Sequence, residues 1–285
     1  METFFQAPWS AAIWLLNWTT GKYSHHCGGS IISDKYIMTA AHCLDHRLIS
    51  ENSSISEPIS VKNYMKIIVG MENPGLNCSK KEDVTYYIKD YFIHPKFDFP
   101  YFDVAIIELE SNINFTKGIA PVCLSSASPS DLEYRAVSLF GWGARNYEGI
   151  PSKVLLGTRQ LAVTSVENCK SKIDFFTFGD PLYESVFNRT NWLKTNPSDQ
   201  EISMEGIICV ADQDPNGWTG SCGGDSGSAV VQRAFGSDGS RKYEQVGIVS
   251  GGRCSYRDTP RVLAHIGHED VLEFINTISK FTRYQ

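Results

Sequence analysis

The chain has 285 residues, of which 42% are hydrophobic and 20% charged, a composition that suits one or two packed domains and excludes a disordered chain. Its 26 basic and 32 acidic side chains give a net charge of −6, so no basic surface is expected for binding nucleic acid or an anionic membrane. Residues 4–21 carry no charge, but Pro8 and several polar residues interrupt them, which excludes a membrane span there.

Short β-rich runs separated by Gly, Pro, Asn and Ser recur along the chain and predict an antiparallel β-barrel or sandwich. In chain order the predicted strands cover residues 30–32, 36–41, 84–93, 104–109, 136–140, 154–163, 229–235, 245–250 and 261–266. Near the C-terminus, Val271, Phe274, Ile275 and Ile278 share one helical face and predict a helix over about 268–280. Polar tracts between these runs are typical of surface loops, and none has the composition of an interdomain linker.

The cysteines and the glycosylation motifs indicate the compartment. Eight cysteines are present without any C-x-x-C pair, which argues against a zinc or thioredoxin-like site. Five N-x-S/T motifs accompany them, at Asn17, Asn52, Asn77, Asn114 and Asn188. Together they favour a secreted, disulfide-bonded glycoprotein. The first six residues do not resemble a signal peptide, so we expect the signal upstream of this chain or already removed.

Three local motifs carry the candidate chemistry: His42 in TAAHC, Asp103 at the start of DVAIIEL, and Ser226 in SCGGDSGS. Each residue alone is common in a structural role, at a strand end or in a tight loop. Acyl transfer, however, needs a hydroxyl nucleophile, an imidazole base, an orienting carboxylate and backbone N–H groups for the oxyanion. The three motifs together supply all of these. A zinc-protease motif is excluded, because no Glu lies between His42 and His46.

These motifs resemble the trypsin-like (chymotrypsin-fold) serine peptidase family. Further matches run from residue 8 to the final helix: PW at 8–9, CGGSII at 27–32, IHP at 93–95, PVCL at 121–124, GWG at 141–143 and GIVSGG at 247–252. The α/β-hydrolases are excluded, because their catalytic residues follow the order Ser, acid, His. The resemblance implies one all-β peptidase domain over 1–285, with two antiparallel β-barrels (about 1–120 and 121–266), the active site between them, and the C-terminal helix.

The resemblance also implies a role for each site residue. His42 is expected to be the general base, Asp103 its orienting carboxylate and Ser226 the nucleophile, with no cofactor and no metal. The backbone N–H groups of Gly224 and Ser226 would form the oxyanion hole. Two residues of the GIVSGG motif complete the assignment: Ser250 would hydrogen-bond the triad acid, and Gly252 would pair with the substrate backbone.

Three disulfides are implied by the resemblance: Cys27 with Cys43, Cys169 with Cys209, and Cys222 with Cys254. Two cysteines then remain. We expect Cys78 and Cys123 to pair with each other; the alternative is a bond from Cys123 to a propeptide cysteine outside this chain.

The expected specificity pocket departs from that of trypsins. Gly220, next to Ser221, stands where trypsins carry the aspartate that binds Lys or Arg, and Arg261 stands where the family usually has glycine. A guanidinium in a partly desolvated pocket attracts a carboxylate. This arrangement resembles granzyme B and predicts cleavage after Asp or Glu. The alternative is that Arg261 points to solvent or blocks the pocket.

Activation in this family frees an N-terminal Ile or Val whose ammonium pairs with the acid before the nucleophile, here Asp225. No such terminus precedes Pro8, so we expect the sequence to begin inside a longer precursor; a chain that starts naturally at Met1 would be expected to be inactive.

The leading hypothesis is a secreted, monomeric serine endopeptidase whose partners are protein or peptide substrates and protein inhibitors. The alternative is a catalytically inactive homologue that binds a protein through the same cleft. A third interpretation, a calcium-stabilised member, rests on Glu72 and Glu82 in one loop, whose setting does not resemble the usual ligand pattern.

Overall fold

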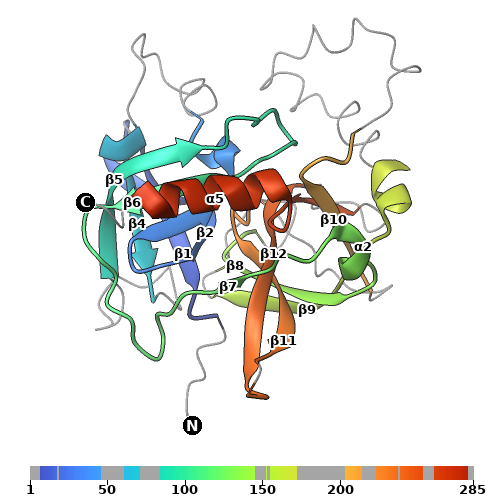
Figure 1. Ribbon diagram of the computed structural model, residues 1–285. Coiled ribbons are helices and arrows are strands. Elements are labelled where there is room, and N and C mark those ends of the chain that lie inside the picture. The colour runs from blue at the N-terminus through green and yellow to red at the C-terminus, as the bar shows by residue number, and fades with distance from the viewer. Residues whose placement is uncertain are drawn as a thin grey trace, which may run out of the picture.

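Six strands of the N-terminal half close into an antiparallel barrel in the order β1-β2-β3-β6-β5-β4 (Figure 1). They are β1 (Ser10–Asn17), β2 (Lys22–Ile31), β3 (Tyr36–Thr39), β4 (Met65–Val69), β5 (Val84–Ile93) and β6 (Ala105–Leu109). The computed structural model describes residues 7–17, 19–45, 61–70, 84–144, 152, 155–171, 203–213, 223–236, 238–252 and 260–281.

A second ring of six strands lies in the C-terminal half. Its order is β11-β8-β9-β10-β13-β12, and an additional pairing of β12 with β11 closes it. These strands are β8 (Ala136–Gly141), β9 (Leu156–Val163), β10 (Ile207–Asp212), β11 (Ala229–Phe235), β12 (Arg241–Gly251) and β13 (Arg261–His265). The short β7 (Cys123–Leu124) adds to β12 in parallel. The expected fold of two antiparallel barrels is therefore confirmed.

Burial explains why these segments form strands. In β5, Tyr86 and Ile88 point into the core while Tyr87 and Lys89 between and after them are exposed, as expected for a strand with one wet face. All five residues of β6 are buried, and its one charged member, Glu108, is paired with Lys89 Nζ at 2.9 Å. Buried charges normally require such a partner.

The structure corrects several strand predictions. The predicted strand over 84–93 coincides with β5, but the one over 30–32 was wrong in its start, because β2 begins at Lys22. Its first eight residues, KYSHHCGG, have weak β-propensity, yet together with Ser30 they pair along the whole of β1, from Asn17↔Lys22 to Ser10↔Ser30. The sequence reasoning missed β1, β4, β7 and β10 altogether, since none of them shows clear alternation.

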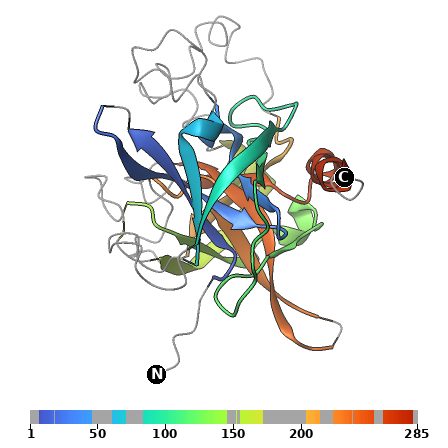
Figure 2. The same ribbon diagram turned by 90° about the vertical axis from the view of Figure 1, so that its left-hand side faces the viewer.

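Few helices complete the fold. The predicted C-terminal helix is confirmed as α5 (Glu269–Phe281), drawn in red in Figure 1, and its Val271, Ile275 and Ile278 join the core cluster of the first barrel. Shorter helices in the described part of the chain include α2 (Pro129–Leu132), η1 (Ala41–Cys43) and η2 (Val61–Asn63), and residues 166–171 are helical as well. Among the described residues, no helix combines the length and apolar character needed to cross a membrane. Figure 2 shows the hairpin of β11 and β12 projecting beyond the body, with α5 seen end-on.

Candidate active site

His42 lies in η1, directly after β3, and both its backbone and its ring bind Asp103. The His42 backbone N–H donates to Asp103 Oδ1 at 2.8 Å, and His42 Nδ1 lies 2.7 Å from Asp103 Oδ2. Asp103 itself precedes β6, which is the neighbour of β3 in the barrel. Adjacent strands therefore bring together two residues that are 61 positions apart.

Asp103 is fully buried, so its carboxylate oxygens need hydrogen-bond partners within the protein. Ser250, near the end of β12 in the second barrel, donates its hydroxyl to Asp103 Oδ2 at 2.6 Å. The hydrogen bond expected between Ser250 and this carboxylate is thus formed. With the two contacts from His42, the carboxylate has partners from both barrels, which offset the cost of burying it.

The charge of Asp103 controls the protonation of His42. With Nδ1–H pointing at the carboxylate, the lone pair of Nε2 is left to accept a proton. Burial favours the neutral ring, but the charge and hydrogen bond of Asp103, helped by the charge of Asp45, outweigh it and raise the pKa of His42. The pair is therefore electrostatically suited to accept and stabilise a proton.

The Ser226 segment meets the first barrel at two glycines. The Gly28 N–H, in β2, donates to the carbonyl of Ser226 at 2.7 Å. Gly227 has a φ of +83°, and a Cβ there would collide with the carbonyl of Gly28 and the hydroxyl of Thr39. The structure thus places Ser226 against the strands that lead to His42. Within the described part of the chain, no hydrogen bond yet joins the Ser226 hydroxyl to His42, and such contacts are often loose before substrate binds.

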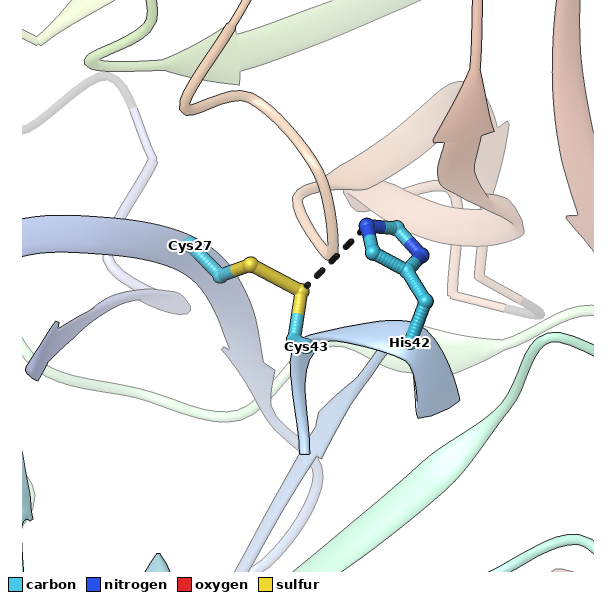
Figure 3. Close-up of side chains that lie close together, drawn as sticks. All are labelled: Cys27, His42 and Cys43. Atoms are coloured by element: carbon cyan, nitrogen blue, oxygen red, sulfur yellow. Dashed lines mark hydrogen bonds between the residues drawn. A yellow bond between two sulfur atoms is a disulfide. The ribbon is translucent and has the colours of Figure 1, made fainter. Parts of the chain in front are cut away.

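A disulfide fastens this junction. Cys27, next to Gly28, is bonded to Cys43, next to His42, and Cys43 Sγ lies 3.8 Å from His42 Nε2 (Figure 3). Cys27, His42 and Cys43 are the one group of three or more possible metal ligands within the described ranges. Since the disulfide consumes both thiolates that a metal would need, this group is not a metal centre.

The carboxylate of Asp225, directly before Ser226, is enclosed by the GWG segment at 141–143. Asp225 is buried and accepts from the Gly143 N–H at 2.8 Å, while a Cβ on Gly141 or Gly143 would collide with its carboxylate. Gly224, the expected oxyanion-hole residue, has a φ of +93°, which the absence of a side chain permits. Its α-carbon faces the ring of His25, whose Nδ1 a Cβ would meet at 3.3 Å.

Only part of the expected specificity pocket can be placed, because Gly220 and Ser221 lie outside the described residues. Arg261, at the start of β13, is buried rather than directed to solvent. Its stem lies against Gly252, where a Cβ would meet Arg261 Cδ at 2.6 Å. Burial lowers the pKa of the guanidinium, while the charges of Asp212 and Asp225 oppose that shift.

The structure forms two of the expected disulfides, Cys27–Cys43 and Cys169–Cys209. Cys123, at the start of β7, is a free cysteine exposed to solvent, so its expected pairing with Cys78 is not formed. Cys78, Cys222 and Cys254 lie outside the described residues, as do Asn52, Asn77, Asn188, Glu72 and Glu82. Asn17 and Asn114 are both exposed, as glycan acceptors must be.

Sequence reasoning missed three aromatic neighbours of the site. The Phe99 ring meets the His42 ring edge-on, with centroids 5.8 Å apart. Phe102 precedes Asp103 with a φ of +50°, and His26 Nε2 lies 3.1 Å from the carbonyl of Cys43. No local pattern marked them; only their position beside the motifs of His42 and Asp103 could have directed attention to them.

Comparisons with known proteins agree with this geometry. The family model described as trypsin matches residues 4–268. The chain is 27% identical over 265 residues to the serine protease filzig of Drosophila melanogaster, with 92% of this chain but 13% of that protein covered. It is 24% identical to human serine protease 41 and 25% identical to human testisin, over 91% and 92% of this chain and 69% and 71% of theirs. The chain therefore spans a small part of one relative and about seven-tenths of the other two.

Proposed function

Because this chain belongs to the trypsin family of serine peptidases, we propose that it hydrolyses peptide bonds through an acyl-enzyme on Ser226. The observation that supports this most directly is the buried network in which Asp103 accepts hydrogen bonds from His42 and Ser250. Members of the family need not all be active, so competence is part of the proposal.

The proposed reaction uses His42 twice. Its Nε2 takes the hydroxyl proton of Ser226 while Oγ attacks the peptide carbonyl, and Asp103 stabilises the imidazolium that forms. The N–H groups of Gly224 and Ser226 would hold the oxyanion. His42 then passes the proton to the leaving amine. In the second half, water attacks the acyl-enzyme while His42 Nε2 takes its proton, and His42 returns that proton to Ser226 Oγ as the ester bond breaks and the acid leaves.

A serine-directed fluorophosphonate probe tests competence. We would treat the processed protein, made with its natural upstream sequence, alongside Ser226→Ala and Asp103→Asn. Labelling that Ser226→Ala abolishes and Asp103→Asn strongly slows would support the peptidase. A folded, processed protein that never labels would favour the alternative, a homologue that binds a protein partner through the same cleft.

We further propose that the peptidase prefers Asp or Glu before the scissile bond. The support is the burial of Arg261 beside Gly252, since a desolvated guanidinium gains from pairing with a carboxylate. The negative charges of Asp212 and Asp225 already stabilise the charged guanidinium, so a substrate carboxylate would compete with them for Arg261.

Substrate selectivity of Arg261→Gly decides this point. Substrates that differ only in having Asp, Glu, Leu or Lys before the bond would be compared, with the exposed Arg135→Gly as the control. Loss of the acidic preference in Arg261→Gly alone supports the proposal. An unchanged ranking would mean that the two aspartates fully neutralise Arg261.

We propose that the protein is secreted as a monomeric zymogen and carries N-linked glycans. The two disulfides and the exposed Asn17 and Asn114 are consistent with an oxidising secretory route. The enclosed Asp225 is the expected partner of a freed N-terminus. Amidase removal of N-glycans would test glycosylation, N-terminal sequencing of the active form would test activation by cleavage, and sedimentation of protein recovered from the medium would test both secretion and the monomeric state.

A further inference from the structure

We infer that Phe102 is a positioning residue for catalysis, which holds Asp103 in place through a ring stack with His94 that is tied to α5. This inference rests on the proposed peptidase function. Phe102 touches no reacting atom, so any effect it has must pass through Asp103.

The backbone around Phe102 is unusual. Its φ of +50° lies in the left-handed region, which bulky residues rarely occupy, and such residues collect at functional sites. The Val104 N–H donates to the carbonyl of Phe102 at 2.7 Å, which closes a tight turn with Asp103 at its centre. The conformation of Phe102 therefore directly sets where the Asp103 carboxylate points.

Side chains around the Phe102 ring hold that conformation. The ring stacks on His94 with centroids 4.9 Å apart and planes 8° from parallel, and meets His268 edge-on at 5.1 Å. Lys96 Nζ lies 5.5 Å from its centroid, where a cation is attracted to the ring face. From the second barrel, Gly206 leaves room for the ring: a Cβ there would meet Phe102 Cδ1 at 3.0 Å.

His94 links this stack to α5. His94 Nδ1 accepts from the Lys96 N–H at 3.2 Å, so its Nε2 carries the proton, and this nitrogen lies 3.3 Å from the carbonyl of Asp270. Phe274, one turn further along α5, meets the His94 ring with centroids 4.9 Å apart. Lys96 also pairs with Asp270 at 2.8 Å. The start of α5 is thus joined through His94 and Phe102 to the triad acid.

The functional consequence follows from geometry. Asp103 has to meet both the backbone and the ring of His42, so a small rotation of the turn breaks at least one of these bonds. Misplacement of about 1 Å can slow catalysis about 100-fold. A weaker contact with Asp103 must also lower the pKa of His42, because that charge is what raises it.

The test compares four variants with the wild type. Phe102→Gly keeps the left-handed backbone and loses the ring; Phe102→Leu keeps apolar bulk and loses the stack; Phe274→Leu loosens the stack from α5. Ile278→Ala is the control, since it removes buried bulk from α5 one turn beyond Phe274, at a residue that makes no ring contact with His94 or Phe102. The readouts are kcat and KM, the melting temperature, and the titration of His42 followed by NMR, which requires no turnover.

We expect kcat to fall about 100-fold in both Phe102 variants with little change in KM, and the His42 pKa to fall with it. Phe274→Leu should change both in the same direction by less, and Ile278→Ala should lower only the melting temperature. Phe102 variants that melt earlier but keep the wild-type His42 titration would overturn the inference. An inactive wild type would refute the proposed function instead, while the His42 titrations would still decide the role of Phe102.

Discussion

Asp103 receives two hydrogen bonds from the same residue, one from the backbone N–H of His42 and one from its ring. The first fixes the position of η1 and the second fixes the rotation of the imidazole. Ser250, from the other barrel, donates to the same Asp103 oxygen as the His42 ring. Both barrels therefore help to orient the His42 imidazole.

Removing the Ser250 hydroxyl should slow catalysis without unfolding the protein. A hydrogen bond to a buried charge contributes about 1.5–3 kcal/mol, so Ser250→Ala is expected to lower kcat/KM about tenfold or more. Steady-state kinetics would measure this, with the exposed Ser171→Ala as control. Equal rates for both variants would show that the two bonds from His42 suffice to hold Asp103.

The raised pKa of His42 predicts the acid limit of activity. Only the neutral ring accepts the serine proton, so activity should disappear as the pH falls through a pKa above the ordinary 6.5. The acid limb of kcat/KM against pH measures this value in the free enzyme. Ser250→Ala and the Phe102 variants should move the limb to lower pH only if the charge of Asp103 has become less effective; a wild-type limb below 6.5 would contradict the assignment.

His25 should make the protein less stable in acid. Burial, and then the charge of His26, lower the pKa of His25 to about 4, and within the described residues its Nε2 has no hydrogen-bond partner. Between pH 6.5 and 4 the unfolded chain would take up a proton that the folded chain excludes, so stability falls as pH falls, by about 3 kcal/mol at most. Urea unfolding of His25→Gln across this range should show a flatter acid slope, and a parallel slope would refute the role of His25.

Loss of the Cys27–Cys43 disulfide should cost both stability and activity. The bond closes a loop of 16 residues and joins β2 to η1, so Cys27→Ser with Cys43→Ser is expected to lose about 3 kcal/mol. Denaturant unfolding would measure the loss of stability. Labelling by the fluorophosphonate probe would show whether His42 still activates Ser226. Cys123→Ser, at the exposed free cysteine, should change neither.

Two glycines with similar φ values allow the cost of backbone strain to be measured separately from the cost of a steric collision. Gly227 and Gly239 have φ values of +83° and +76°, but a Cβ collides with Thr39 and Gly28 only at Gly227, whereas nothing lies within 4 Å at Gly239. Gly239→Ala should lose about 1 kcal/mol from backbone strain alone. Gly227→Ala should lose several-fold more and should stop probe labelling. Similar melting temperatures for the two variants would mean that Gly28 and Thr39 can move aside for the added Cβ at little cost in stability.

Local patterns predicted some of this molecule well and some of it not at all. β5 alternates from Thr85 to Lys89 and α5 repeats its apolar residues at helical spacing, so each was visible from its own segment. The network around Asp103 joins residues 61 and 147 positions apart; the chemistry of acyl transfer related His42 to Asp103, and only the family resemblance added Ser250. Phe102 and His94 depend on packing against α5, which begins 175 positions after His94, so no window of sequence contains that relationship.

The hydrogen bond from Gly28 to Ser226 has a consequence for how such a chain can vary. Ser226, the proposed nucleophile, belongs to the second barrel, but its backbone is held by a strand of the first, so the proposed catalytic unit includes the contact between the two barrels. A hybrid protein with its second barrel taken from a relative would contain a Ser226 segment that normally packs against a different β2. Only hybrids that keep the small residues on both sides of this contact should retain a usable nucleophile, and the halves are therefore constrained to change together.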